Sequence, residues 1–221
     1  AKLKQRFRPM PVQTKICGLS TPETVDAAIK GGASHIGLMF FPPSPRNIGF
    51  ERARKLAVRI PDHVRRVGVF VDPCNALIDQ ALEAGQLDVL QLHKTTPGRA
   101  AAIRLHARRE TWSAIGIRTA SDLALAASYR DAVDLLLYDA GQPEDAALPG
   151  GMGIRFDWSL LAGFDHPLPW GLAGGLTAAN VAEAVGATGA RLVDTSSGVE
   201  SAPGIKDVDK IAAFLKATAS L

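Results

Sequence analysis

The sequence predicts a single-domain (β/α)₈ barrel of the TIM-barrel class, in which eight parallel strands close into a ring and helices cover its outside. Short runs rich in Val, Leu and Ile alternate with stretches of helical spacing along the chain, eight of each. Such runs are typical of a parallel sheet that is buried on both faces. No GxGxxG motif follows the first run and no change of composition marks a second domain. A closed barrel is therefore preferred to an open, doubly wound sheet.

The expected strands are short, apolar and followed by Gly, Pro, Ser or Asp residues. They cover residues 12–17, 35–40, 65–71, 88–92, 112–117, 134–138, 170–173 and 191–193. Helices are expected from the start signal at 20–23 to residue 30, at 50–59, from 72–73 onward, at 97–108, from about 121–122, at 156–162, at 177–185 with Thr177 as N-cap, and at 208–218. The segments 41–49 and 140–154 are too long for simple connectors.

The composition is that of a soluble globular domain, with 47% apolar residues, 21% charged residues and a net charge of +3. Basic residues gather only at 1–11, which we expect to be a flexible, solvated leader rather than a nucleic-acid-binding arm, before a barrel at 12–221. The sequence shows neither a membrane-length apolar run nor a signal-peptide pattern, so no membrane partner is expected. With only Cys17 and Cys74, a reducing cytoplasm is the expected setting. The absence of metal-ligand spacings such as CxxC or HExxH in the sequence predicts no metal site.

Two glycine-rich loops follow the last two expected strands. The first contains Gly174 and Gly175, and the second contains Ser196, Ser197 and Gly198. Loops of this kind leave backbone N–H groups exposed, and a helix that begins there adds partial positive charge. Barrels of this class place a phosphate site after strands seven and eight. The sequence therefore predicts that the two loops bind a phosphate group together.

Ionisable side chains gather where the expected strands end, which is the working face of such a barrel. Cys17 ends the first strand, and its place between a lysine and a glycine favours a reactive thiol over a buried structural one. Asp139 follows four apolar or aromatic residues, so its surroundings are expected to raise the pKa of its carboxyl group. A carboxyl group with a raised pKa suits a proton donor.

Three further polar residues near the ends of the expected strands each allow two interpretations. His93 is either a hydrogen-bonded pocket wall or a catalyst, and Asp194 either contributes to the site or braces the loop after it. Arg46 lies in a proline-stiffened loop, where its planar guanidinium either binds a carboxylate or is a solvated surface group.

Seven sequence blocks, in register from about residue 14 to residue 210, closely resemble phosphoribosylanthranilate isomerase, a (β/α)₈ enzyme of tryptophan biosynthesis. The blocks are KICGL at 15–19, SPR at 44–46, VGVF at 67–70, LQLH at 90–93, GG at 150–151 with FDW at 156–158, LAGGL at 172–176, and DTSSGVE at 194–200 with PG at 203–204 and KD at 206–207. KICG alone would be a weak signal. Seven blocks in the same order and spacing are specific.

The resemblance implies an Amadori rearrangement without a cofactor, the third step of tryptophan biosynthesis from chorismate. N-(5-phosphoribosyl)anthranilate becomes 1-(2-carboxyphenylamino)-1-deoxyribulose 5-phosphate. By the same resemblance, Cys17 is the general base, Asp139 is the general acid, and Arg46 binds the anthranilate carboxylate. His93 and Asp194 would contact the substrate, and the two glycine loops would bind its phosphate. A monomer, a homodimer and association with other tryptophan-pathway enzymes are all compatible with the sequence.

The chain departs from the family pattern at four positions. Lys94 and Thr195 replace a usual glycine and valine, while Met152 and Ile154 replace the threonine and lysine of a GGTGK block. Met152 lacks the hydroxyl group of the usual threonine in the loop after the sixth expected strand. This departure puts closure of that loop over the substrate in doubt, but not the acid–base pair of Cys17 and Asp139. Among rivals, indole-glycerol-phosphate synthase would need lysines at more strand ends, and the histidine-pathway isomerase would need an aspartate in place of Cys17. A barrel that binds a phosphorylated ligand without turnover would not need Cys17 and Asp139.

Overall fold

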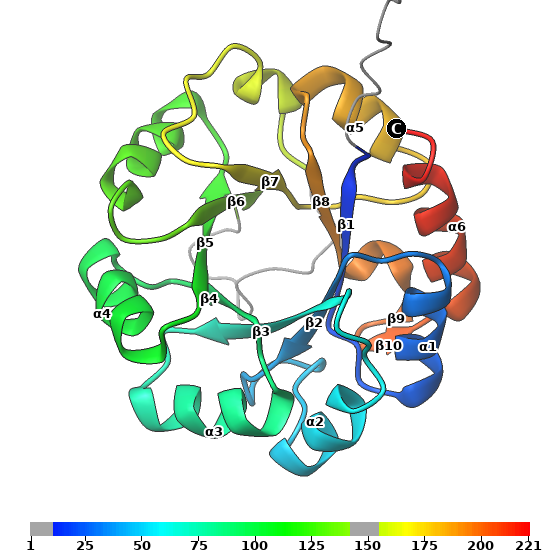
Figure 1. Cartoon of the computed structure of the whole chain (residues 1–221). Helices are drawn as coiled ribbons and strands as arrows, with labels where there is room; N and C mark the ends of the chain where they lie inside the picture. The colour runs from blue at the N-terminus through cyan, green and yellow to red at the C-terminus, as the bar shows by residue number, and fades with distance from the viewer. Residues whose placement is uncertain (1–10, 142–154) are drawn as a thin grey trace, which may run out of the picture.

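The computed structural model describes residues 11–141 and 155–221. In this part of the chain, eight parallel strands form a closed barrel in sequence order, as shown in Figure 1. The strands are β1 (Gln13–Cys17), β2 (His35–Met39), β3 (Arg65–Val71), β4 (Val89–His93), β5 (Glu110–Ile117), β6 (Leu135–Ala140), β7 (Trp170–Leu172) and β8 (Leu192–Thr195). β1 pairs with β8 over four residues and thereby closes the ring. The predicted barrel is confirmed.

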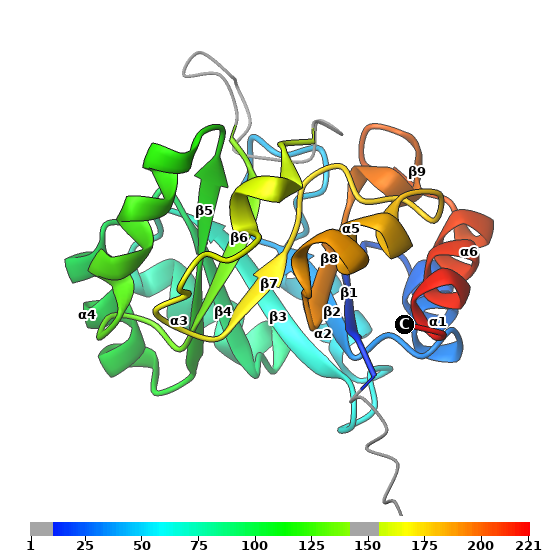
Figure 2. The same cartoon turned by 90° about the horizontal axis from the view of Figure 1, so that it is seen from above.

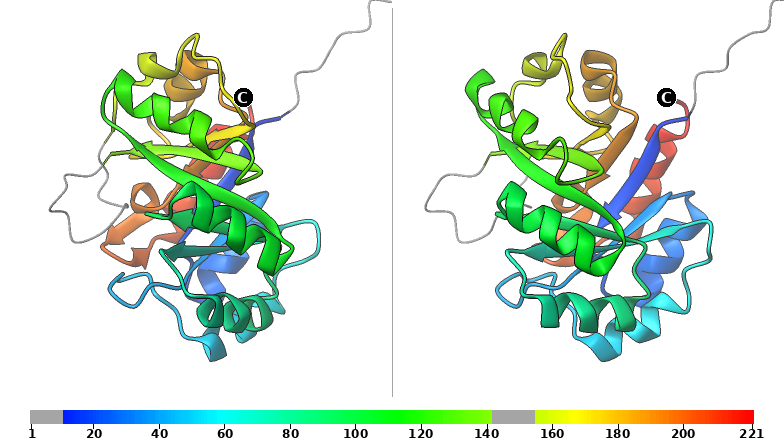
Figure 3. Two further views of the ribbon diagram at one scale, coloured as in Figure 1. Left: turned by 90° about the vertical axis from the view of Figure 1, so that its left-hand side faces the viewer. Right: turned by 60° about the vertical axis from the view of Figure 1, so that its left-hand side comes forward.

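Helices cover the outside of the ring. They are α1 (Pro22–Lys30), α2 (Phe50–Ala57), α3 (Asn75–Gly85), α4 (Pro97–Ala107), the 3₁₀ helices η1 (Ala120–Tyr129) and η2 (Trp158–Leu161), α5 (Val181–Thr188) and α6 (Val208–Thr218). The strands run upward in Figure 2, so their C-terminal ends all lie at one end of the barrel. The start of β1 and the chain's C-terminus lie side by side (Figure 3). The hydroxyl groups of Thr14 and Thr218 are 3.0 Å apart.

Four predicted helix starts or types were wrong. The helix expected from about 121–122 is the 3₁₀ helix η1 rather than an α-helix. The helix expected at 177–185 begins only at Val181, because the Asn180 side chain accepts a hydrogen bond from the Thr177 N–H and donates one to the carbonyl of Gly175. These bonds hold the segment in a turn, so Thr177 is not the N-cap. The helix expected at 156–162 is a single 3₁₀ turn, because Gly163 follows it with a φ of +75°. The helix expected from 72–73 starts at Asn75.

A small hairpin that was not predicted follows β8. It consists of a short 3₁₀ turn, η3 (Ser197–Val199), and the antiparallel strands β9 (Glu200–Ala202) and β10 (Ile205–Lys206). Pro203 and Gly204 form the turn between the strands, and Gly204 has a φ of +80°. The hairpin lies at the same end of the barrel as the C-terminal ends of the strands (Figure 2).

The described residues have two apolar cores. The larger one fills the space between the strands and the helices. The smaller one lies inside the ring and contains Val67, Val69, Val89, Trp112 and Leu192, with Cys17 at its upper edge. Side chains two residues apart on a strand share a face, so Lys15 points into the ring together with Cys17. The apolar inner core thus gives way to ionisable groups toward the C-terminal ends.

Several predictions fall outside the described residues. The leader at 1–11 does so except for its last residue, and so do Met152 and Ile154. The boundary between leader and barrel therefore stays a prediction. Among the described helices, none has the length and apolarity needed to cross a bilayer.

Candidate active site

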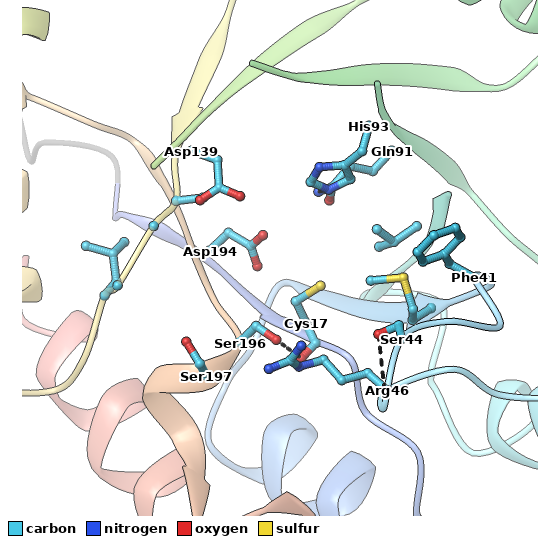
Figure 4. A pocket seen from close by; sticks show the side chains of 16 residues that line it. Cys17, Phe41, Ser44, Arg46, Gln91, His93, Asp139, Asp194, Ser196 and Ser197 are labelled. Atoms are coloured by element: carbon cyan, nitrogen blue, oxygen red, sulfur yellow. Dashed lines mark hydrogen bonds between the residues drawn. The ribbon is translucent and has the colours of Figure 1, made fainter. Parts of the chain in front are cut away.

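The C-terminal ends of the strands surround one pocket, and polar side chains from β1, β4, β6, β8 and two loops converge on it (Figure 4). The predicted site residues that line it are Cys17, Arg46, His93, Asp139, Gly174, Gly175, Asp194, Ser196 and Ser197. Sequence reasoning missed Gln91, which also lines the pocket, and Lys15, which lies beneath it. Gly198 is not in the lining but belongs to the same loop as Ser196 and Ser197. No group of three or more potential metal-binding side chains occurs within residues 11–141 and 155–221.

Asp139 enters the pocket from β6. Burial raises the pKa of its carboxyl group to about 7, and the negative charge of Asp194 acts in the same direction. The N–H group of Ala140 donates a 2.8 Å hydrogen bond to the carboxylate and, together with the charge of Lys15, limits the rise. A carboxyl group with this pKa is substantially protonated near neutral pH, so it can donate a proton.

Cys17 enters the same pocket from β1, across the ring from β6. Its side chain is buried, and burial raises the pKa of the thiol. The positive charge of Lys15 is the largest influence that lowers it. Cys17 and Asp139 therefore bring a thiol and a carboxyl group with separated pKa values to one cavity, which is the arrangement that acid–base catalysis requires.

Asp194 forms an ion pair with Lys15 inside the ring. The Lys15 ammonium lies 2.9 Å from Oδ2 of Asp194, and Lys15 is fully buried. Burial acts to lower the pKa of Lys15, but the charges of Asp194 and Cys17 raise it above its ordinary value. Burial raises the pKa of Asp194, and the charge of Lys15 opposes that rise. The other oxygen of Asp194, Oδ1, is buried without a hydrogen-bond partner among the described residues. Asp194 thus faces the pocket and does more than brace its own loop.

His93 lies at the pocket wall, where its Nε2 is 3.0 Å from the Gln91 side-chain nitrogen. Burial, with the charges of Lys15 and Lys94, lowers the pKa of His93 to about 4. The imidazole is therefore neutral at physiological pH. Oε1 of Gln91 is buried and lacks a partner within the described residues, so it is an acceptor oriented toward the same cavity wall.

Arg46 is buried at the pocket edge rather than solvated. Its Nε and Nη2 donate to the two carboxylate oxygens of Glu200 at 2.7 and 2.8 Å. Lys206 donates to the same carboxylate at 2.7 Å, so two cations share one anion. The cluster carries a net positive charge beside the pocket, although sequence reasoning found neither Glu200 nor Lys206. Arg46 and Glu200 are 154 positions apart in the sequence, which explains why local patterns could not reveal the pair.

The two glycine loops lie side by side, as predicted. The Thr195 hydroxyl donates a 2.7 Å hydrogen bond to the Leu176 carbonyl and thereby joins them. Gly174 and Gly175 have φ values of +89° and +63°, and a Cβ on Gly174 would lie 2.5 Å from the amide nitrogen of Ala140. Only glycine allows this approach at little cost. Because α5 begins at Val181 rather than just after Thr177 as expected, its N-terminus lies farther from the glycine turn. The backbone N–H groups of the loops then provide the anion-binding potential.

Gly198→Ala is expected to separate the two loops. An added Cβ would overlap the Leu176 carbonyl oxygen and lie 2.8 Å from the Thr195 hydroxyl. We expect the substrate KM to rise about tenfold or more, since a lost charge-assisted hydrogen bond is worth roughly 1.5–3 kcal/mol. Gly186→Ala in α5 is the matched control, because nothing lies within 4 Å of its added Cβ. Equal KM values for the two variants in a steady-state assay would contradict a binding role for the loop.

The sequence model of the N-(5'-phosphoribosyl)anthranilate (PRA) isomerase family matches residues 14–217. The chain belongs to this family. A PRA isomerase from Zymomonas mobilis subsp. mobilis is 55% identical over 214 residues, covering 94% of this chain and 98% of the relative. A PRA isomerase from Paramagnetospirillum magneticum is 53% identical over 209 residues, covering 94% and 97%.

Solved PRA isomerases share the fold. The enzyme from Thermotoga maritima superposes with a TM-score of 0.84 at 34% identity, covering 95% of this chain and all of that one. A PRA isomerase in complex with reduced 1-(o-carboxyphenylamino)-1-deoxyribulose 5-phosphate superposes with a TM-score of 0.82 at 33% identity, with the same coverage. The resemblance noted in the sequence is thus confirmed, in preference to the rival barrel families.

Proposed function

We propose that this chain isomerises N-(5-phosphoribosyl)anthranilate to 1-(2-carboxyphenylamino)-1-deoxyribulose 5-phosphate, with Asp139 as general acid and Cys17 as general base. The observation that carries this assignment is that both side chains line one pocket beside the paired glycine loops. Family membership supports the reaction, and a relative solved with a reduced product analogue supports a phosphorylated sugar as substrate.

In the first step Asp139 protonates the ring oxygen of the ribose, and the C1′–O bond breaks to leave a Schiff base. Its pKa of about 7 keeps enough of the acid form available for this transfer. In the second step the Cys17 thiolate removes the proton from C2′, and the electron pair moves toward the cationic nitrogen to form an enolamine. Tautomerisation of the enolamine gives the ketose product, so atoms and charge balance without a cofactor.

The pocket offers positive potential for the two anionic groups of the substrate. Arg46 would bind the anthranilate carboxylate, since its guanidinium lines the pocket and Lys206 shares the negative charge of Glu200. The loops with Gly174 and Ser196 would bind the phosphate through backbone N–H groups. The Ser196 hydroxyl group is fixed by Lys206, which donates to it at 3.1 Å.

The test is a fluorescence assay with freshly generated phosphoribosylanthranilate, whose anthranilate emission is lost on conversion. Wild type is expected to give a continuous decay. Arg46→Gln is expected to raise KM about tenfold or more, because a charged hydrogen bond to carboxylate is removed. If the fluorescence changed only by an amount equal to the protein added, without continued conversion, the chain would be a binding protein and the proposal would be refuted.

The Thermotoga maritima relative is described as dimeric, and monomers generated from it have also been solved. For this chain, both a monomer and a homodimer remain predictions, as does association with other tryptophan-pathway enzymes. The proposed reaction places the chain in tryptophan biosynthesis, and a cytoplasmic location is the corresponding expectation.

A further inference from the structure

A lysine lies directly below the proposed catalytic thiol, where the assigned chemistry has no use for it. Lys15 and Cys17 are two residues apart on β1 and both point into the ring. The strand on one side provides Asp194, which is paired in register with Lys15. The strand on the other side provides Gly37, which is paired in register with Cys17.

Gly37 leaves space in which the lysine and the thiol come together. A Cβ on Gly37 would lie 3.0 Å from Sγ of Cys17 and 3.2 Å from Nζ of Lys15. The sulfur and the ammonium nitrogen therefore border the same small gap, and any side chain at this position would push between them. Asp194 holds the ammonium group from the other side at 2.9 Å.

The charges around Cys17 come from several elements packed against it. Lys15 and Asp194 lie below it, and Lys206 of β10 contributes a more distant positive charge. The other charged or titratable groups that line the pocket are Arg46, His93 and Asp139. Of these groups, Lys15 acts most strongly in favour of the ionised sulfur, and its effect exceeds the opposing effect of Asp194.

We propose that Lys15, held in place by Asp194, is a positioning residue that stabilises the thiolate of Cys17. Lys15 touches the base rather than the substrate, and Asp194 keeps it protonated and oriented. When the thiolate accepts the C2′ proton, the Lys15 ammonium no longer has a negatively charged sulfur beside it. Its positive charge is then balanced by the Asp194 carboxylate. This role rests on the proposed function of Cys17 as the base.

The size of the effect of Lys15 on the reaction rate depends on the pKa values of Asp139 and Cys17. The active form has protonated Asp139 and ionised Cys17, although the pKa of the acid lies below that of the thiol. Between the two pKa values, the fraction of this form decreases about tenfold for each unit that separates them. Any lowering of the Cys17 pKa by Lys15 therefore increases the active fraction in proportion.

The test measures the ionisation of Cys17 directly. In a Cys74→Ser background, which removes the exposed thiol, the rate of iodoacetamide alkylation of Cys17 is followed by mass spectrometry as a function of pH. The alkylation midpoint is the pH at which the alkylation rate is half its maximum. Lys15→Met is expected to raise this midpoint by at least about one pH unit and to lower kcat/KM at pH 7.5 about tenfold or more. The loss of kcat/KM should diminish as the pH rises.

Two companion variants separate the role in ionisation from a structural one. Lys15→Met with Asp194→Leu removes both charges, so that no unpaired carboxylate is buried, and it too should raise the alkylation midpoint. Thr14→Val is the matched control, because it removes a buried hydrogen bond on the same strand but on its outer face. Its midpoint should equal that of the wild type.

An unchanged alkylation midpoint in both Lys15 variants would overturn the proposal, even if activity fell. The proposed function fails in a different way. A wild-type protein without isomerase turnover, in which the midpoint nevertheless responds to Lys15→Met, would refute the role of Cys17 as base while leaving the lysine–thiol interaction intact.

Discussion

Cys17→Ser is expected to lower kcat/KM for phosphoribosylanthranilate by about 10²–10⁴, the contribution of a positioned general base, because Cys17 is the proposed base. A hydroxyl group ionises far less readily than a thiol, so the variant lacks a base at C2′ at any accessible pH. Because serine is similar in size to cysteine and the side chain is only 6% exposed, packing should be preserved. The quantity to measure is single-turnover conversion by loss of fluorescence.

A binding measurement serves as the control for this loss. The affinity for the reduced product analogue should change by less than about threefold, since the loops and Arg46 that would bind its charged groups are unaltered. Cys74→Ser should leave kcat/KM unchanged, because Cys74 is exposed at the start of α3. Retention of more than a tenth of the wild-type rate by Cys17→Ser would show that another group acts as the base.

Asp139→Asn has two opposite effects. It removes the proposed general acid, so kcat should fall by about 10²–10⁴. It also removes a carboxylate that the folded protein destabilises, so the free energy of unfolding should increase by about 1–4 kcal/mol at pH 8. The amide oxygen of asparagine can still accept the hydrogen bond from the Ala140 N–H group, so the local structure has no reason to change.

The pH dependence identifies the cause of that stabilisation. The pKa of Asp139 is about 7 in the folded protein and 3.8 for the ordinary group. Below the lower value both states hold the proton, and the carboxyl group has no pH-linked effect on stability. As the pH rises toward the higher value, the unfolded state becomes relatively more stable. The stability difference between variant and wild type, measured by urea unfolding, should therefore be larger at pH 8 than at pH 4. A constant difference would mean that the carboxyl group is not perturbed by burial.

Local sequence patterns were sufficient for the barrel and for the residues that end its strands. Apolar runs located all eight strands to within a few residues, and position at a strand end was enough to identify Cys17, His93 and Asp139 as pocket residues. Alternation along β1 could also have suggested Lys15, since residues two apart share a face. The start of the helix at Val181 was misplaced because the Asn180 side chain, bonded to Thr177 and Gly175, holds the preceding residues in a turn.

The remaining features depend on contacts between distant parts of the chain. Glu200 reads as an ordinary surface residue in the sequence, and only folding places it against Arg46. The hairpin β9–β10 was missed because its strands contain three and two residues, too few for a periodic signal. By contrast, the four apolar or aromatic residues before Asp139 were enough to predict a raised pKa, and burial in the assembled ring does raise it.

The bond between Arg46 and Glu200 has a consequence for synthesis on the ribosome. The loop after the second strand reaches its final form only when a segment near the opposite end of the chain has arrived. A nascent polypeptide that has emerged only as far as the seventh strand lacks both the partner of Arg46 and the strand that closes against β1. Catalytic competence in this protein therefore arises at the end of translation rather than gradually.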